Sequence, residues 1–381
     1  MKKFLALTLA LVMSLSLVAC GSKEETPAEG EETPEGTADF SVAMITDYGD
    51  ITDQSFNQTT YEACKAYCEA NGVTFNYFKP AGDSTAERVA MVDAAVADGY
   101  NVIVMPGYAF AETIKETAEL YPDVTFIALD VAQGDLGEDY TVPSNVYCAV
   151  YQEELCGYMA GYAAVKLGYT HLGVLGGMAV PAVQRFGYGF VQGADAAAVE
   201  MGIADQVVME YVYGNQFFGD SDITAYMDNW YQTLGVQVVF ASGGGIFTSA
   251  AEAAAKVGGK LIGVDVDQAG IIDGGYGEGM TVTSAMKGLA PTVEHILTEI
   301  AAGNFANYGG KIETLGLVSG DDPTANYVQL PMESTQWGDG FTQDDYKALV
   351  KAMYDGGVTV SNDISAMPAT TITVNFAGNI K

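Results

Sequence analysis

Three carboxylates, a serine, an asparagine and the aromatic ring of Phe56 lie within a single stretch, Ile45–Asn57 (I-T-D-Y-G-D-I-T-D-Q-S-F-N). It follows a short apolar run and precedes a helix-like run, Gln58–Asn71, so it is expected to form a long turn at the end of a first strand. Open α/β sheets bind ligands at that edge. Polar groups around one aromatic face, that of Phe56, suit a small planar polar molecule. Alternatively, Asp53 or Ser55 simply caps the next helix.

Other polar and aromatic residues follow later predicted strands. Asp130 and Asp265 each end an apolar run (F-I-A-L-D and L-I-G-V-D), where a carboxylate can accept hydrogen bonds from amines or hydroxyls, or can cap the following turn. Phe217 and Phe218 follow another strand, and alternation directs only one of them to a cleft unless both pack in the core. Lys287 follows T-S-A-M, and its alternative is an ordinary solvated lysine.

A glycine-rich segment, Ser242–Gly245 (S-G-G-G, including Gly244), could hold a phosphate through backbone N–H groups. It is not a P-loop, because the spacing and the Lys-Ser/Thr ending are absent. The chain contains no G-x-S-x-G, no H-E-x-x-H and no G-x-G-x-x-G followed by an acidic residue. Without a base–nucleophile pair, we expect a binding protein that uses no cofactor, and not an enzyme.

No metal site is expected, because the only two histidines, His171 and His295, are well separated in the sequence. A C-x-x-x-C pair without nearby histidines is a poor metal signal. The cysteines after residue 21 are therefore predicted to be small core residues. They are Cys64, Cys68, Cys148 and Cys156.

The amino terminus predicts export and anchoring. Two lysines precede the apolar run Phe4–Val18, which is too short to favour a membrane span. It ends in L-V-A-C-G, similar to the bacterial lipoprotein cleavage box, so residues 1–19 are predicted to be a signal peptide and Cys20 to carry lipid. A plain secretory signal is the alternative. Residues 20–39, acidic and poor in apolar side chains, are expected to be a disordered tether.

The formal net charge of −33 argues against a nucleic-acid partner, since that binding relies on basic residues. It also argues against a polybasic membrane patch, so the membrane is expected to be contacted through the lipid anchor alone. The predicted location is the extracytoplasmic side of a bacterial cell membrane.

From residue 40 onward, short β-rich runs alternate with helical stretches in two successive series, which predicts two α/β lobes with parallel sheets joined by a hinge. The order changes after Asp265: a strand at Thr281–Ser284 is expected to return to the first lobe, followed by a helix at Leu289–Ala302. The expected bounds are residues 40–146 with about 276–305 for lobe 1, and 147–275 with about 306–381 for lobe 2 and the hinge.

Four segments together resemble the basic membrane protein family of bacterial lipoproteins, the nucleoside-binding components of ABC importers. They are D-x-G-x-x-x-D-x-S-F-N (Asp47–Asn57), Y-P-D-V-T-F-I-A-L-D (Tyr121–Asp130), G-V-D-V-D-Q (Gly263–Gln268) and T-S-A-M-K (Thr283–Lys287). The resemblance covers about residues 40–300, and it implies a type I periplasmic-binding-protein fold whose two lobes close on a ligand.

In that family a purine base is stacked between two aromatics, one from each lobe. The resemblance therefore implies that Phe56 stacks on one face of the base and Phe218 on the other, with Phe217 as the alternative. Asp130 would bind the base edge.

The resemblance also assigns the remaining candidates. Asp265 and Lys287 would hold the ribose hydroxyls, while Asp53 and Asn57 would shape the mouth of the site. Charged acceptors of this kind reject analogues that lack a hydroxyl, because the acceptors would be left unpaired.

The leading hypothesis is a lipid-anchored receptor that delivers a nucleoside, with a purine favoured, to an ABC permease and its ATPase. A receptor of the same fold for a sugar or another small polar metabolite is the first alternative. A ligand sensor that signals without transport is the second, and a nucleoside hydrolase or phosphorylase is the least favoured.

Overall fold

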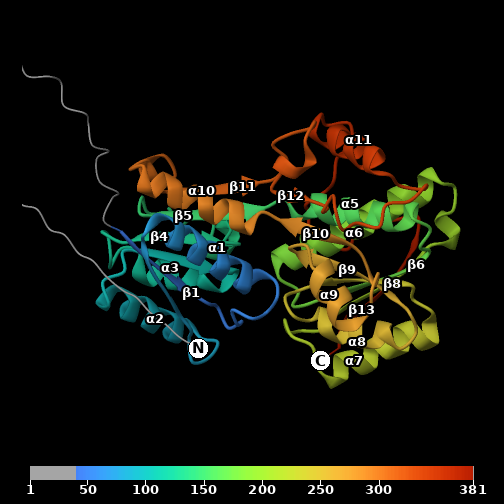
Figure 1. Ribbon diagram of the computed structural model, residues 1–381, viewed down its shortest axis with the longest axis horizontal. Helices are drawn as coiled ribbons and strands as arrows, with labels where there is room; N and C mark the ends of the chain where they lie inside the picture. The colour runs from blue at the N-terminus through green and yellow to red at the C-terminus, as the bar shows by residue number, and fades with distance from the viewer. Residues whose placement is uncertain (1–39, 381) are drawn as a thin grey trace, which may run out of the picture. The chain divides into compact units, whose positions relative to one another are not determined.

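The computed structural model describes residues 40–380, which form two α/β lobes (Figure 1). The sheet of lobe 1 has the order β11-β5-β4-β3-β1-β2, and every pairing in it is parallel. Apart from Ser41 and Thr125 at their starts, its inner strands β1, β3, β4 and β5 consist of apolar and aromatic residues, as expected for parallel strands covered by helices on both faces. The strands are β1 (Ser41–Ile45), β2 (Thr74–Phe78), β3 (Val102–Pro106), β4 (Thr125–Leu129), β5 (Val146–Tyr151) and β11 (Lys311–Leu315). The helices are α1 (Phe56–Asn71), α2 (Thr85–Ala97), α3 (Ala111–Thr117), α4 (Gln133–Leu136) and α10 (Leu289–Ala301).

The sheet of lobe 2 has the order β12-β10-β9-β8-β6-β7-β13, and only the β10–β12 pairing is antiparallel. Its strands are β6 (His171–Gly176), β7 (Val208–Tyr213), β8 (Val238–Ser242), β9 (Lys260–Asp265), β10 (Thr281–Lys287), β12 (Val328–Gln329) and β13 (Thr373–Asn379). Its helices are α5 (Glu153–Lys166), α6 (Pro181–Glu200), α7 (Ser221–Asp228), α8 (Phe247–Ala255), α9 (Ala269–Tyr276) and α11 (Gln343–Tyr354).

Helices α5 and α6 pack unusually close together. A Cβ atom added at Gly161 of α5 would lie 2.1 Å from the carbonyl oxygen of Phe190 in α6, so only glycine fits there. Gly157, Gly189 and Gly193 make equivalent approaches, each to a carbonyl oxygen of the other helix. This packing fixes the first turns of the two helices against each other.

The chain crosses between the lobes three times: from β5 to α5, from β10 to α10, and from β11 to β12. Backbone hydrogen bonds tie the crossings together. The N–H of Gln152 donates to the carbonyl of Leu315 at 3.0 Å, and the N–H of Gly288 donates to that of Tyr327 at 2.7 Å. The three crossings thus form one hydrogen-bonded hinge.

The expectation that the strand at Thr281–Ser284 returns to the first lobe is wrong. This strand, β10, pairs in parallel with β9 in the second sheet, because the short helix α9 closes an ordinary crossover between neighbouring strands. The chain returns to lobe 1 one element later, with α10 and then β11. The expected boundary also divided strand β5, with its first residue in lobe 1 and the rest in lobe 2, but the whole strand lies in the sheet of lobe 1, between β4 and β11.

The segment after β12 packs on lobe 2. Trp337, Phe341 and Tyr346 form an aromatic cluster that reaches Tyr162 of α5, and β13 extends the sheet beside β7. The four cysteines of the described part are buried and free, which confirms their prediction as core residues.

Three other predictions fall on residues before the described range. The predicted signal peptide, the lipidation of Cys20 and the tether lie outside residues 40–380. Within that range, no helix has the length and apolar character needed to cross a membrane, and no group of three or more His, Cys, Asp or Glu residues could hold a metal ion.

Candidate ligand-binding site between the lobes

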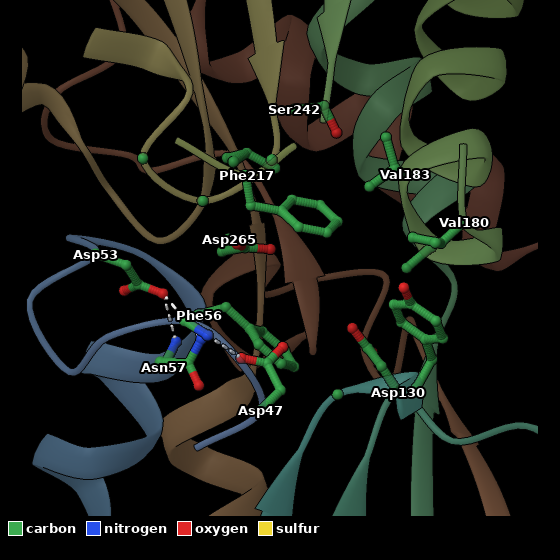
Figure 2. Close-up of a pocket in the computed structure, with 18 of the residues that line it drawn as sticks. Asp47, Asp53, Phe56, Asn57, Asp130, Val180, Val183, Phe217, Ser242 and Asp265 are labelled. Atoms are coloured by element: carbon green, nitrogen blue, oxygen red, sulfur yellow. Dashed lines mark hydrogen bonds between the residues drawn. The ribbon is translucent and has the colours of Figure 1, made fainter. Parts of the chain in front are cut away.

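A cavity of about 530 Å³ lies at the carboxyl ends of the strands, with walls from both lobes. Parallel strands place the turns that follow them at this edge, which explains why residues distant in the sequence meet here. All nine predicted ligand-binding residues line the cavity: Asp53, Phe56, Asn57, Asp130, Phe217, Phe218, Gly244, Asp265 and Lys287. Figure 2 shows most of them around one space.

The turn after β1 is organised by Asp53. One carboxylate oxygen accepts from the N–H groups of Ser55 and Gln58, at 2.9 and 3.0 Å. The other accepts from the backbone and side-chain N–H groups of Asn57, at 2.9 and 3.2 Å. The capping alternative therefore holds for Asp53, which satisfies N–H groups at the start of α1. Ser55 does not cap the helix; its hydroxyl donates to Asp265 of the other lobe at 2.5 Å.

Lys287 is the centre of a buried charge cluster. Its ammonium lies 2.5 Å from a carboxylate oxygen of Asp130, 3.5 Å from one of Glu153 and 3.7 Å from one of Asp265. Burial alone would lower the pKa of Lys287, but these three carboxylates outweigh it and the pKa is raised. The lysine is therefore charged throughout the physiological range, and the alternative of a solvated lysine is excluded.

Asp130 and Asp265 have the same unusual backbone conformation, with φ of +60° and +66°. Aspartate tolerates this left-handed region better than most residues. In each case the strand ends abruptly and the carboxylate turns toward Lys287. Neither side chain caps a following turn, so the capping alternative is wrong for both. Strain of this kind gathers at functional sites.

Two aromatic rings face the cavity from opposite lobes. Phe56 begins α1, and the ammonium of Lys287 lies 4.7 Å from its ring centroid. The ring of Phe217 projects into the cavity from lobe 2 (Figure 2). Its neighbour Phe218, which the sequence favoured, also lines the cavity but is 62% exposed. Of these two rings, that of Phe217 is therefore the one that projects into the cavity.

The backbone around Phe217 explains its position. A Cβ atom added at Gly177 would lie 2.5 Å from the Phe217 ring, and one at Gly243 would lie 3.1 Å from it. The ring therefore fills space that the two glycines leave open. Phe218 instead forms an isolated bridge with Gly245, which leaves its side chain outward.

Several lining residues were not singled out from the sequence. Asp47 is 8% exposed and accepts a hydrogen bond from the N–H of Gly49 at 2.6 Å; burial raises its pKa to about 6. It lies beside Asn57 at one end of the cavity (Figure 2). The turn offered three carboxylates, and only the fold reveals which of them is buried.

Arg185 and Tyr48 were also missed. Arg185, near the start of α6, lines the cavity and donates to Glu153 at 2.6 Å. Tyr48 reaches across the cleft: its ring centroid lies 6.0 Å from that of Phe217, and its hydroxyl donates to the Met178 sulfur at 3.4 Å. No motif marks either residue, because both act through tertiary contacts.

Three buried oxygen atoms of the lining have no hydrogen-bond partner among the described residues. They belong to Asn57, Asp130 and the hydroxyl of Ser242. Buried polar groups normally have a hydrogen-bond partner. These two acceptor oxygens and one hydroxyl are therefore positioned to form hydrogen bonds with a polar ligand.

Two lobes of parallel sheet around a cleft at the strand ends define a type I periplasmic solute-binding fold. A solved ABC transporter solute-binding protein from Aeropyrum pernix has this fold, with a TM-score of 0.65 at 22% identity, covering 85% of this chain and 88% of that one. Residues 40–321 match the family model of the PnrA-like ABC transporter substrate-binding proteins. The chain belongs to this family, the basic membrane protein (Bmp) family, which confirms the resemblance seen in its motifs.

Two curated relatives are similar over most of their length. The "CD4+ T-cell-stimulating antigen" of Listeria innocua is 28% identical over 331 residues, covering 82% of this chain and 87% of that protein. The "ABC transporter nucleoside-binding protein BmpA" of Lactococcus lactis is 25% identical over 380 residues, covering 94% and 99%. The family is one of solute-binding proteins and not of enzymes.

Proposed function

We propose that this protein is a lipid-anchored extracytoplasmic receptor that captures a nucleoside, with purines preferred, and delivers it to an ABC permease and its ATPase. The observation that carries the proposal is the pair of rings, Phe56 and Phe217, that face one cavity from opposite lobes beside a carboxylate–lysine cluster. The name of the Lactococcus relative agrees with it. The lipid anchor rests on the sequence around Cys20.

In the proposed complex, the base lies between the rings of Phe56 and Phe217, where stacking contributes about 1–3 kcal/mol per base. The ribose hydroxyls lie against Asp265, Asp130 and the ammonium of Lys287. The sequence assigned Asp130 to the base edge; its ion pair with Lys287 favours the ribose instead.

The base edge is then left to Asp47 and Asn57, which lie side by side in the lobe 1 wall of the cavity (Figure 2). Asp53 stays a turn-forming residue, because its carboxylate is occupied by backbone N–H groups. Phe218, at the rim, and Gly244, beside the Phe217 backbone, border the site.

The test is a thermal-shift panel on ligand-stripped protein with nucleosides, free bases, sugars and amino acids. A nucleoside at a hundred times its dissociation constant should add about 2.7 kcal/mol to the free energy of unfolding. We expect stabilisation by purine nucleosides and none by ribose or free bases. Stabilisation by sugars alone would favour a sugar receptor of the same fold, and would overturn the nucleoside assignment.

The pKa of Asp47 gives the site an expected pH dependence. The N1 position of inosine donates a hydrogen bond, so it needs the Asp47 carboxylate, which is lost as the pH falls through about 6. The N1 position of adenosine accepts, so it suits the protonated acid. The ratio of inosine to adenosine affinity, measured calorimetrically at pH 5 and 7.5, should therefore rise with pH.

The matched control is Asp47→Asn, which keeps the shape of the side chain but does not titrate. Its inosine-to-adenosine ratio should be the same at both pH values. If the wild-type ratio is equally flat, Asp47 does not read the base edge.

A further inference from the structure

Glu153 contacts two cationic side chains of the cavity wall but does not line the cavity itself. It is fully buried at the first position of α5. One carboxylate oxygen accepts from the Arg185 guanidinium at 2.6 Å, and the other lies 3.5 Å from the Lys287 ammonium. Both cations line the cavity, and Glu153 does not. The carboxylate is therefore a support for the site, placed where the chain crosses from β5 to α5.

The members of this cluster are divided unequally between the lobes. Glu153, Arg185, Asp265 and Lys287 all belong to elements of lobe 2, namely α5, α6, β9 and β10. Asp130, which follows β4, is the one carboxylate of lobe 1 that reaches Lys287. The shortest contact of the lysine is therefore the one that must break when the lobes separate.

Separation of the lobes poses an electrostatic problem for Lys287. Its side chain is 3% exposed, and a buried charge that loses its partner is strongly unfavourable. Asp265 and Glu153 remain with it in lobe 2. A carboxylate that stays with the lysine lowers the free-energy penalty of losing Asp130, and so favours the open form.

We propose that Glu153 is a positioning residue of the ligand site, which holds Lys287 and Arg185 in the cavity wall and, as their counter-ion within lobe 2, sets how readily the lobes separate. The inference rests on the proposed function, because it assumes that this cavity is the ligand site. It assigns a role to a residue that would not touch the ligand.

Two substitutions should act in opposite directions. Glu153→Gln keeps the side-chain shape but removes the resident negative charge, so Lys287 depends more on Asp130 and the closed form is favoured. Arg185→Gln frees the Glu153 carboxylate for Lys287, so the open form is favoured. The pair keeps the inference testable even where one variant folds poorly.

The measurement is the distance between spin labels on the full chain without ligand, attached at Glu119→Cys in lobe 1 and Thr233→Cys in lobe 2, both exposed positions. The native cysteines of the described part are buried, and the parent without the two introduced cysteines sets the background. We expect shorter distances for Glu153→Gln and longer ones for Arg185→Gln than for the wild type.

The matched control is Glu154→Gln, which removes the next carboxyl of the same turn. That carboxyl is also buried but has no ion pair within residues 40–380 and does not line the cavity. Its distances should equal those of the wild type. A purely structural role for Glu153 would lower the free energy of unfolding and leave the distances unchanged, which would overturn the inference, as would a shift of Glu153→Gln toward the open form.

Dissociation of inosine supplies a second readout. It should be about tenfold slower from Glu153→Gln than from the wild type and from Glu154→Gln, within the usual range of coupling between sites. Equal dissociation rates would contradict the inference. The distance measurement needs no ligand, so it tests the role of Glu153 even if the protein does not bind nucleosides. If the protein binds nucleosides but the distances are unchanged in Glu153→Gln, the proposed function stands and the inference about Glu153 is wrong.

Discussion

Phe56→Ala is expected to weaken purine nucleoside binding by roughly 5- to 150-fold, the equivalent of about 1–3 kcal/mol of stacking. The ring is one wall of the proposed base site, and it also contacts the ammonium of Lys287, at 4.7 Å from the centroid. The side chain is only half-buried at the start of α1, so the fold should persist. Calorimetric titration with inosine gives the affinity, and the melting temperature checks the fold.

A comparison of the two neighbouring phenylalanines sharpens this prediction. Phe217→Ala should weaken binding about as much as Phe56→Ala, because both rings face the cavity (Figure 2). Phe218→Ala is the matched control, since its ring is 62% exposed, and it should bind nearly as the wild type does. A larger loss in Phe218→Ala than in Phe217→Ala would restore the preference drawn from the sequence.

Lys287→Met should lower the free energy of unfolding by about 3–5 kcal/mol, as expected when one partner of a buried ion pair is removed. Three carboxylates, those of Asp130, Glu153 and Asp265, would lose their shared counter-ion. Denaturant unfolding measures the loss. The control is Lys79→Met, which removes an exposed lysine paired with Asp50, where the expected loss is about 0–1 kcal/mol.

The loss in Lys287→Met should depend on pH. Burial already raises the pKa values of Glu153 and Asp265, and without the ammonium of Lys287 they rise further, so the folded protein binds more protons than the unfolded chain. The free energy of unfolding then decreases as the pH rises through the raised pKa values. We expect a larger difference from the wild type at pH 8 than at pH 5. A difference that is equal at both values would mean that the carboxyls are not coupled to Lys287.

The sequence predicted the alternation of strands and helices and the turns that carry the candidate site. Both predictions depend on local properties, namely the spacing of apolar residues and the position of polar residues after each predicted strand. It did not predict which sheet β10 joins, since a short apolar run pairs equally well with either. It favoured Phe218 over Phe217, whereas the ring of Phe217 is the one that projects into the cavity. Strand β7 ends at Tyr213, so alternation no longer applies four residues later, and the glycines at 177 and 243 decide the matter.

The charged support of the site escaped prediction for a different reason. Glu153 and Arg185 lie near the starts of two helices, where charged residues are common and usually solvated. Only the close packing of α5 and α6 brings them together and buries Glu153. Asp47 was one of three carboxylates in its turn, and its burial depends on the whole cleft. Such properties belong to tertiary structure, which a pattern of residue types does not carry.

The left-handed backbone at Asp130 and Asp265 has a consequence at the level of the gene. Few residues accept this conformation readily, chiefly glycine, asparagine and aspartate. An aspartate codon becomes an asparagine or a glycine codon by a single base change. At both positions, one nucleotide substitution can therefore delete the negative charge and keep the turn. If the proposed function holds, a single nucleotide change at either codon could therefore alter which ligand the protein prefers without altering its fold.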